Sequence, residues 1–240
     1  LFTHRLPSQA DRDGLQRQLE AMIRGRDPLM ADIPNPMRRL IRHQLGYFRD
    51  AMPEGFDLRG ASMGNLILAG GYLNNHRDLG SIIFLFEKLV SVQGTVRAIV
   101  RDNLHLGAIL QDGREVIGQH RLTGKEVAPL TSPVVRLFLS KHADRAVEVT
   151  PQLRKRNRYL IEEAELICYP PGSFYSSVLA NLLPTGVGRA VAANQAPKVY
   201  VPNLGRDPEQ IGMDLSGAVA RLLAPMQRDC PTAQPDQLLN

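Results

Sequence analysis

Residues 166–183 read LICYPPGSFYSSVLANLL, and the predicted architecture of the chain is built outward from this stretch. A short apolar run ends at two prolines and a glycine, and a helix-compatible segment begins at about Ser173. This order predicts a strand, a tight turn and a helix. Gly172 allows a ligand to approach the backbone, and Ser173 can cap the helix.

The first turn of that helix carries hydroxyl groups and has no carboxylate nearby in the sequence. Tyr175, Ser176 and Ser177 supply the hydroxyls. The free backbone N–H groups of a helix N-terminus attract anions, so the turn predicts a seat for a phosphate. An ordinary strand-to-helix turn with a serine cap explains the same residues, and the pattern alone leaves both interpretations open.

A second loop of this kind spans residues 59–66, RGASMGNL, and runs straight into an apolar segment. It predicts another helix N-terminus with polar groups, a cation and room for close approach of the backbone. The alternative is a helix packed tightly through Gly64, Gly70 and Gly71. The candidate ligand-binding residues of the loop are Arg59, Gly60, Ser62, Gly64 and Asn65.

Strands alternate with helices from residue 166 to residue 201, which predicts a βαβ unit. Ligands of parallel sheets lie beyond the carboxyl ends of the strands. We therefore expect the loops at 62–65 and 172–177 to converge on one anion site. Asn203 would approach this site from the neighbouring strand, and Asn181 and Tyr175 would support the pocket.

Hydrophobic periodicity predicts the other elements. Alternation around a Gly-containing turn at residues 111–114 predicts a hairpin. The last amphipathic helix ends near residue 223, and the tail beyond it is expected to be poorly ordered. Helices are predicted within residues 8–25, 36–48 and 79–90, and strands at 95–100, 104–110, 115–119, 134–139 and 146–149.

Composition narrows the class of protein. The chain has 240 residues, of which 43% are hydrophobic, and no apolar run approaches the roughly 20 residues that span a bilayer. We expect no membrane partner and a cytoplasmic location. The net charge of +5 comes without tryptophan and with only 5% aromatic residues, so nucleic-acid binding is not expected. Two cysteines and six scattered histidines predict no metal site.

Three pieces, read in order, resemble the CofD-like superfamily of 2-phospho-L-lactate transferase and the YvcK-type gluconeogenesis factors. They are the 59–66 loop, the hairpin at Asp112 and Gly113, and residues 169–177 with the Asn-Leu-Leu of 181–183. The resemblance covers roughly residues 57–223 and is greatest to the CofD-like protein of the GAK system. It implies an α/β fold, namely a Rossmann-like three-layer α/β/α arrangement with a mostly parallel sheet. A small antiparallel hairpin element and an N-terminal helical segment would be added to it.

The implied organisation is a helical segment at residues 1–55 packed on the core, a CofD-like core at 56–225 with the hairpin element at 95–120, and a tail at 226–240. The resemblance places the family's first strand, its glycine loop and its candidate catalytic acid before Leu1, where the chain begins within a polar segment. We therefore expect a longer protein, and a parallel-rich sheet that lacks a central strand in this chain.

The resemblance implies a nucleoside diphosphate or nucleotide-sugar ligand held by the two loops. The chain would then be a transferase of a phosphate-ester-linked group, resembling 2-phospho-L-lactate transferase, or a regulatory ligand sensor of the YvcK type. An interaction subunit with a vestigial site is the third alternative, and whether the chain is an enzyme stays open. Magnesium is the one cofactor that the resemblance allows, and no catalytic residue is identified.

The hairpin also suggests self-association. Its alternating pattern supplies more apolar positions than one small hairpin covers by itself. We expect the element to project from the core and to help form a homo-oligomer. The apolar positions are Leu104, Leu106, Ile109 and Val116.

Overall fold

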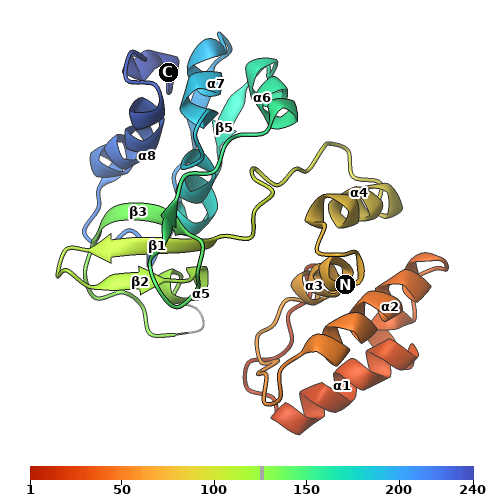
Figure 1. Cartoon of the computed structure of the whole chain (residues 1–240). Helices are drawn as coiled ribbons and strands as arrows, with labels where there is room; N and C mark the ends of the chain where they lie inside the picture. Colours follow the sequence, from red (N-terminus) through yellow and green to blue (C-terminus); the bar gives the residue numbers. More distant parts are fainter. Residues whose placement is uncertain (125–126) are drawn as a thin grey trace. The chain divides into compact units, whose positions relative to one another are not determined.

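The computed structural model describes residues 1–124 and 127–240 of the chain. Two compact units make up the chain, Leu1–Ala98 and Ile99–Asn240 (Figure 1). Within the described residues, no helix is both long and apolar enough to cross a bilayer. The domain boundaries expected near residues 55 and 225 stay a prediction.

The first unit is built from helices whose caps and apolar faces are visible in the sequence. Helix α1 starts after Asp11, whose carboxylate accepts the Gly14 N–H at 2.8 Å, and it ends at Gly25 with φ 74°. The helices predicted within residues 8–25, 36–48 and 79–90 are confirmed. The elements are α1 (Arg12–Arg24), the 3-10 helix η1 (Pro28–Met30), α2 (Met37–Ala51), α3 (Met63–Asn74) and α4 (Leu79–Leu89).

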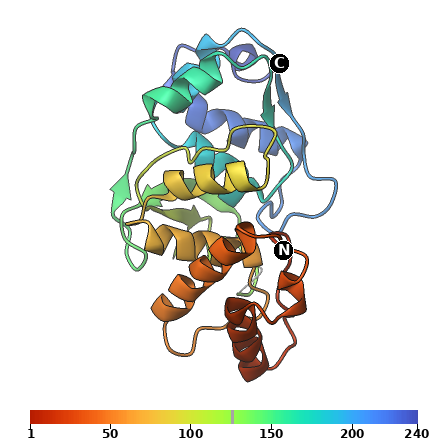
Figure 2. The same ribbon diagram turned by 90° about the vertical axis from the view of Figure 1, so that its right-hand side faces the viewer.

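Glycines set the spacing of α3 from its neighbours. α2 and α3 lie side by side (Figure 1 and Figure 2). A Cβ atom added at Gly70 would lie 1.8 Å from the backbone oxygen of Gln44, and one at Gly71 would lie 2.8 Å from the Ile82 side chain. Real Cβ atoms do not lie so close to other atoms, so only glycine fits at these two positions. This agrees with the alternative interpretation of the 59–66 loop, in which α3 packs tightly through its glycines.

The second unit contains an antiparallel sheet with strand order β2-β1-β3-β4. The predicted hairpin is confirmed, because Ala108 of β1 pairs with Val116 of β2 and Gly113 turns the chain with φ 84°. β3 pairs with the other edge of β1, with Ala108 opposite Leu137. The sheet is formed by β1 (His105–Leu110), β2 (Glu115–Ile117), β3 (Val134–Ser140) and β4 (Glu148–Val149).

Two expectations about this region are wrong. Residues 95–100 form no strand, because the chain passes from one unit to the other there and no neighbouring strand pairs with it in the described residues. The hairpin does not project, since β1 is an inner strand and Leu106 packs in the core of the unit. Ile109 and Val116 are half-buried, and the part of the hairpin in self-association stays a prediction.

A parallel pair of strands completes the α/β character of the unit. β5 (Ile167–Tyr169) pairs with β6 (Lys198–Tyr200), with Cys168 opposite Val199. The described strands thus give a mixed α/β fold, and a mostly parallel sheet is not confirmed. The strands of the four-stranded sheet pair antiparallel throughout, β1 with β2 and β3, and β3 with β4.

The segments after the two parallel strands differ from the prediction. An ordinary helix was expected from Ser173, but residues Phe174–Val178 form a π-helix, η2, followed by a 3-10 helix. The expectation of a poorly ordered tail is wrong, because Leu238 is fully buried and its carbonyl accepts the Tyr169 hydroxyl at 2.8 Å. The remaining elements are α5 (Gln119–Leu122), α6 (Lys155–Glu162), η3 (Leu179–Leu182), α7 (Val187–Ala193), α8 (Leu215–Asp229) and η4 (Pro235–Gln237).

Candidate functional site

The loop that follows β5 is held by carboxylates from a distant part of the sequence. Phe174 N–H donates to Asp207 at 2.8 Å. The N–H groups of Tyr175 and Ser176 donate to one oxygen of Glu209 at 2.6 and 2.9 Å, and the Ser176 hydroxyl donates to its other oxygen at 2.5 Å. The expectation of free N–H groups at this turn is therefore wrong, because the protein's own anions occupy them.

Asn203 lies beside the glycine of the same turn. Its side-chain oxygen accepts the Gly172 N–H at 2.9 Å, and its amide nitrogen donates to the Gly172 carbonyl at 2.6 Å. The same nitrogen also lies 3.2 Å from a carboxylate oxygen of Asp207. The segment after β6 thus fixes the whole turn through Asn203, Asp207 and Glu209, with the amide of Asn203 used inside the protein.

Two aromatic residues anchor the π-helix in the core. The rings of Phe174 and Tyr175 meet edge to face with centroids 5.2 Å apart. The Tyr175 hydroxyl donates to the Val134 carbonyl of β3 at 3.4 Å, and burial raises the pKa of this phenol above its usual range. Tyr175 therefore supports the site from behind and stays a neutral donor.

A cavity of about 330 Å³ opens beside the π-helix, entirely within the second unit. Ser176 and Asn181 of the sequence-predicted set line it, and the Asn181 amide is fixed by donating to the Ser177 carbonyl at 2.7 Å. Three further polar side chains were missed. Asp102, His105 and Gln119 belong to the hairpin region and its connections, where the sequence shows them only as scattered polar residues. Apolar walls are added by Ile99, Val100, Leu104, Leu106, Leu139, Ala180 and Pro184.

Two serines of the loop keep their hydroxyls available. Ser173 makes no side-chain cap bond, and its carbonyl accepts the Ser177 N–H at 2.8 Å. Ser177 is exposed and Ser173 is half-buried. In the part of the chain that the structure describes, these two hydroxyls donate no hydrogen bond, whereas the Gly172 N–H and the Tyr175 hydroxyl are used inside the protein.

The loop of the first unit is also satisfied internally. At the start of α3, Met63 N–H donates to the His4 carbonyl at 2.9 Å and Gly64 N–H to the Phe2 carbonyl at 3.2 Å. The Ser62 hydroxyl accepts the Asn65 N–H at 3.5 Å. These contacts use the first-turn donors that an anion would need. Gly60 fits here because it adopts φ 71° and donates its N–H to the Leu6 carbonyl.

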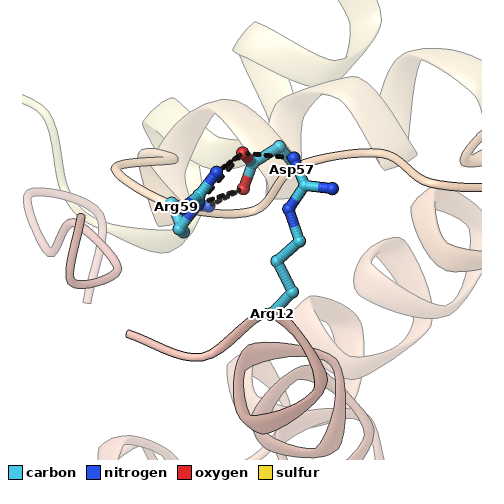
Figure 3. A network of polar contacts seen from close by, with 3 residues as sticks. All are labelled: Arg12, Asp57 and Arg59. Carbon is cyan, nitrogen blue, oxygen red and sulfur yellow. Dashed lines mark hydrogen bonds and ion pairs between the residues drawn. The ribbon is translucent and has the colours of Figure 1, made fainter. Parts of the chain in front are cut away.

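Arg59 is paired with an acid rather than left free for a ligand. Its Nη2 lies 2.6 Å from Asp57, and Arg12 reaches the same carboxylate at 3.1 Å (Figure 3). Hydrogen bonds from the Arg59 side chain, more than any other contact, hold the pKa of Asp57 well below its usual range. The three residues together carry one net positive charge.

This network predicts an acid-resistant carboxylate. Because the pKa of Asp57 is lower in the folded than in the unfolded state, ionised Asp57 favours folding above the usual carboxyl pKa of roughly 4, and this contribution is lost as pH falls through the folded-state pKa. A carboxyl-carbon NMR titration should find Asp57 still ionised near the usual pKa. In Arg59→Gln the titration should move up toward it, and equal titrations in both proteins would contradict the pairing.

The sequence-predicted residues thus fall into two sets. Arg59, Gly60, Ser62, Gly64 and Asn65 belong to the first unit, and the set from Gly172 to Asn203 belongs to the second. Their convergence on one site stays a prediction. Among the described residues, no three His, Cys, Asp or Glu side chains group as metal ligands. The magnesium that the resemblance allows stays a prediction.

Known proteins resemble this chain over most of its length. The gluconeogenesis factor of Bacillus subtilis is 32% identical over 161 residues, which is 67% of this chain and 47% of that protein. The gluconeogenesis factor of Listeria monocytogenes is 33% identical over 151 residues, 62% of this chain and 42% of that one. The chain therefore spans about half the length of the curated relatives it matches.

A solved structure and a family model also match this chain. A crystal structure of a UPF0052 family member from Bacillus halodurans has a TM-score of 0.59 and 21% identity, covering 93% of this chain and 67% of that one. The resemblance to the CofD-like superfamily is confirmed. Because the match to the family described as 2-phospho-L-lactate transferase CofD extends over residues 19–239, the chain belongs to the CofD family.

Proposed function

We propose that this chain binds a nucleotide or nucleotide sugar, with part of the ligand in the cavity beside the π-helix. The observation that carries the proposal is the lining of that cavity. A carboxylate, an imidazole, two amides and a hydroxyl, from Asp102, His105, Gln119, Asn181 and Ser176, face one space with apolar walls. Ligand sites combine apolar walls with a few polar groups in this way, and the volume of about 330 Å³ lies at the small end of their range.

The charges favour an uncharged part of the ligand in this cavity. Asp102 lines it, and Glu209 lies directly behind Ser176, so a phosphate there would meet like charge. Carboxylate and amide groups instead suit the hydroxyls of a sugar or the edge of a base. The phosphates would then lie outside the cavity, toward the Ser173 and Ser177 hydroxyls. The loop at residues 59–66 would add contacts if it converges there.

The CofD family allows both a transferase and a ligand sensor. As a transferase, the chain would move a phosphate-ester-linked group from a nucleoside diphosphate donor. As a sensor, it would bind the ligand and change its behaviour without catalysing a reaction. The relatives named gluconeogenesis factors favour a regulatory role. An interaction subunit with a vestigial site is the remaining alternative. We further propose a cytoplasmic, self-associating protein in which β5 and β6 belong to a larger Rossmann-like sheet.

A cavity-filling variant tests the site. Ala180→Leu places a larger side chain in the cavity, whereas Ala193→Leu makes the same change at the exposed end of α7. A ligand at 100 times its dissociation constant stabilises a protein by about 2.7 kcal/mol. Thermal unfolding should show such stabilisation by a nucleoside diphosphate or nucleotide sugar in the wild type and in Ala193→Leu, and its loss in Ala180→Leu.

Two outcomes would contradict the proposal. One is that none of the nucleoside diphosphates and nucleotide sugars raises the unfolding temperature. The other is that Ala180→Leu binds as tightly as Ala193→Leu. Stabilisation without turnover of the bound compound would favour the sensor over the transferase.

A further inference from the structure

The first unit has a second, larger cavity whose lining is rich in arginine. It measures about 700 Å³ and lies along α1 and the end of α2. Among the described residues, four arginines line it, together with two acids, one glutamine and three apolar side chains. The lining residues are Asp13, Gln16, Arg17, Leu19, Glu20, Ala21, Arg24, Arg26, Arg49 and Met52.

The arginines differ in how firmly they are held. Arg49 contacts Glu20 closely and lies 2.6 Å from Asp50, so it belongs to the framework of the groove. Arg24 lies 3.9 Å from Glu20, and Arg17 lies 3.7 Å from Asp11. Exposed ion pairs at such distances contribute little to stability. Arg17 and Arg24 can therefore leave their partners for a better one.

The end of α1 does not need these side chains. A cation at a helix C-terminus often bonds the last carbonyls. Here the Ala21 and Met22 carbonyls accept the N–H groups of Arg26 and Gly25 at 2.8 and 2.9 Å, and the Ile23 carbonyl accepts Arg42 Nε at 2.7 Å. The side chain of Arg26 is exposed and makes no ion pair within the described residues. The guanidinium groups of Arg24 and Arg26 thus have no capping role.

We propose that this groove docks an acidic segment of a partner polypeptide. Arg17, Arg24 and Arg26 would bind its carboxylates, because the planar guanidinium matches a carboxylate with two parallel hydrogen bonds. Leu19, Ala21 and Met52 provide an apolar floor for a side chain between those carboxylates. Clusters of arginine around an exposed groove are a recurrent mode of acidic-motif recognition.

The same lining disfavours a nucleic acid. No aromatic side chain lines the groove for a base to stack on. Asp13 and Glu20 would repel a continuous phosphate backbone, whereas a peptide can place its carboxylates at the arginines alone. The lining residues alone carry two net positive charges, from four arginines and two acids, while Asp11 and Asp50 outside the lining lie against Arg17 and Arg49. Binding of carboxylates by these arginines should weaken as salt is added.

Fluorescence anisotropy of a labelled nonapeptide with repeated Glu-Glu-Leu units, titrated with the whole chain, tests the proposal. The double variant Arg24→Gln and Arg26→Gln should bind it at least about tenfold more weakly, since two charge-assisted contacts are lost. The matched control, Arg38→Gln and Arg39→Gln, makes the same charge change at the start of α2, outside the residues that line the groove. It should bind within about twofold of the wild type.

Three outcomes would overturn the inference. Equal weakening in both double variants would mean that the net charge of the protein alone accounts for the binding of the peptide. No binding of the peptide by the wild type, or tighter binding of an oligonucleotide with the same number of charges, would exclude an acidic-peptide site. Equal unfolding temperatures of the two double variants exclude misfolding as the cause of any difference between them.

Discussion

Glu209→Ala is expected to lower the free energy of unfolding of the protein by about 3–5 kcal/mol. Glu209 is 2% exposed, and its carboxylate accepts the Tyr175 N–H, the Ser176 N–H and the Ser176 hydroxyl. Each buried donor left without an acceptor costs about 1–3 kcal/mol, and the alanine methyl replaces none of the three bonds. Urea unfolding followed by circular dichroism measures the loss.

Two variants separate this effect from a change of charge. Glu165→Ala removes an exposed acid and should leave the free energy of unfolding nearly unchanged. Glu209→Gln retains one side-chain acceptor oxygen and should lie between Glu209→Ala and the wild type. A loss below about 1 kcal/mol in Glu209→Ala would mean that water replaces the carboxylate and that the turn does not depend on it.

The helices of the first unit could be predicted because their signals are local. In α1 the buried residues Leu15, Leu19 and Met22 recur at helical spacing, and Asp11 caps the helix three residues before Gly14. The loop at residues 59–66 was expected to lead into a helix, and α3 begins there at Met63 with Ser62 as its N-cap. Signals of this kind need only one turn of chain, so the sequence alone contains them.

The direction of the strands could not be predicted in the same way. Successive side chains point to opposite faces in parallel and antiparallel strands alike, so the residues of β3 do not say which strand it pairs with. β3 pairs with β1 across more than twenty intervening residues. The family resemblance favoured a mostly parallel sheet, whereas the described strands form one antiparallel sheet of four strands and one parallel pair.

In the candidate site, too, the features set by neighbouring residues could be predicted, and the contacts with residues far away in the sequence could not. The turn after β5 lies where the sequence predicts it, although a π-helix and not an ordinary helix follows. The carboxylates that accept the N–H groups of this turn are distant in the sequence. Asp207 lies 33 residues after Phe174, and Glu209 lies 34 residues after Tyr175. A helix N-terminus looks the same in sequence whether a ligand or the protein's own carboxylate fills it. That distinction requires the three-dimensional structure.

Gly70→Ala is expected to destabilise the first unit by about 3 kcal/mol, although alanine is the better helix former. The new Cβ would lie 1.8 Å from the Gln44 backbone oxygen and 2.6 Å from its carbonyl carbon. Neither atom belongs to a flexible side chain, so α2 and α3 must move apart along their whole contact. Thermal and urea unfolding measure the effect.

Gly46→Ala is the matched control, because it makes the same substitution on the opposite helix of the pair. A Cβ at Gly46 meets nothing within 4 Å, so only the helix propensity changes. This variant should gain about 0.5–1 kcal/mol. A Gly70→Ala variant as stable as Gly46→Ala would show that α2 and α3 do not approach each other so closely, and Gly70 would then have no packing role at the contact between the two helices.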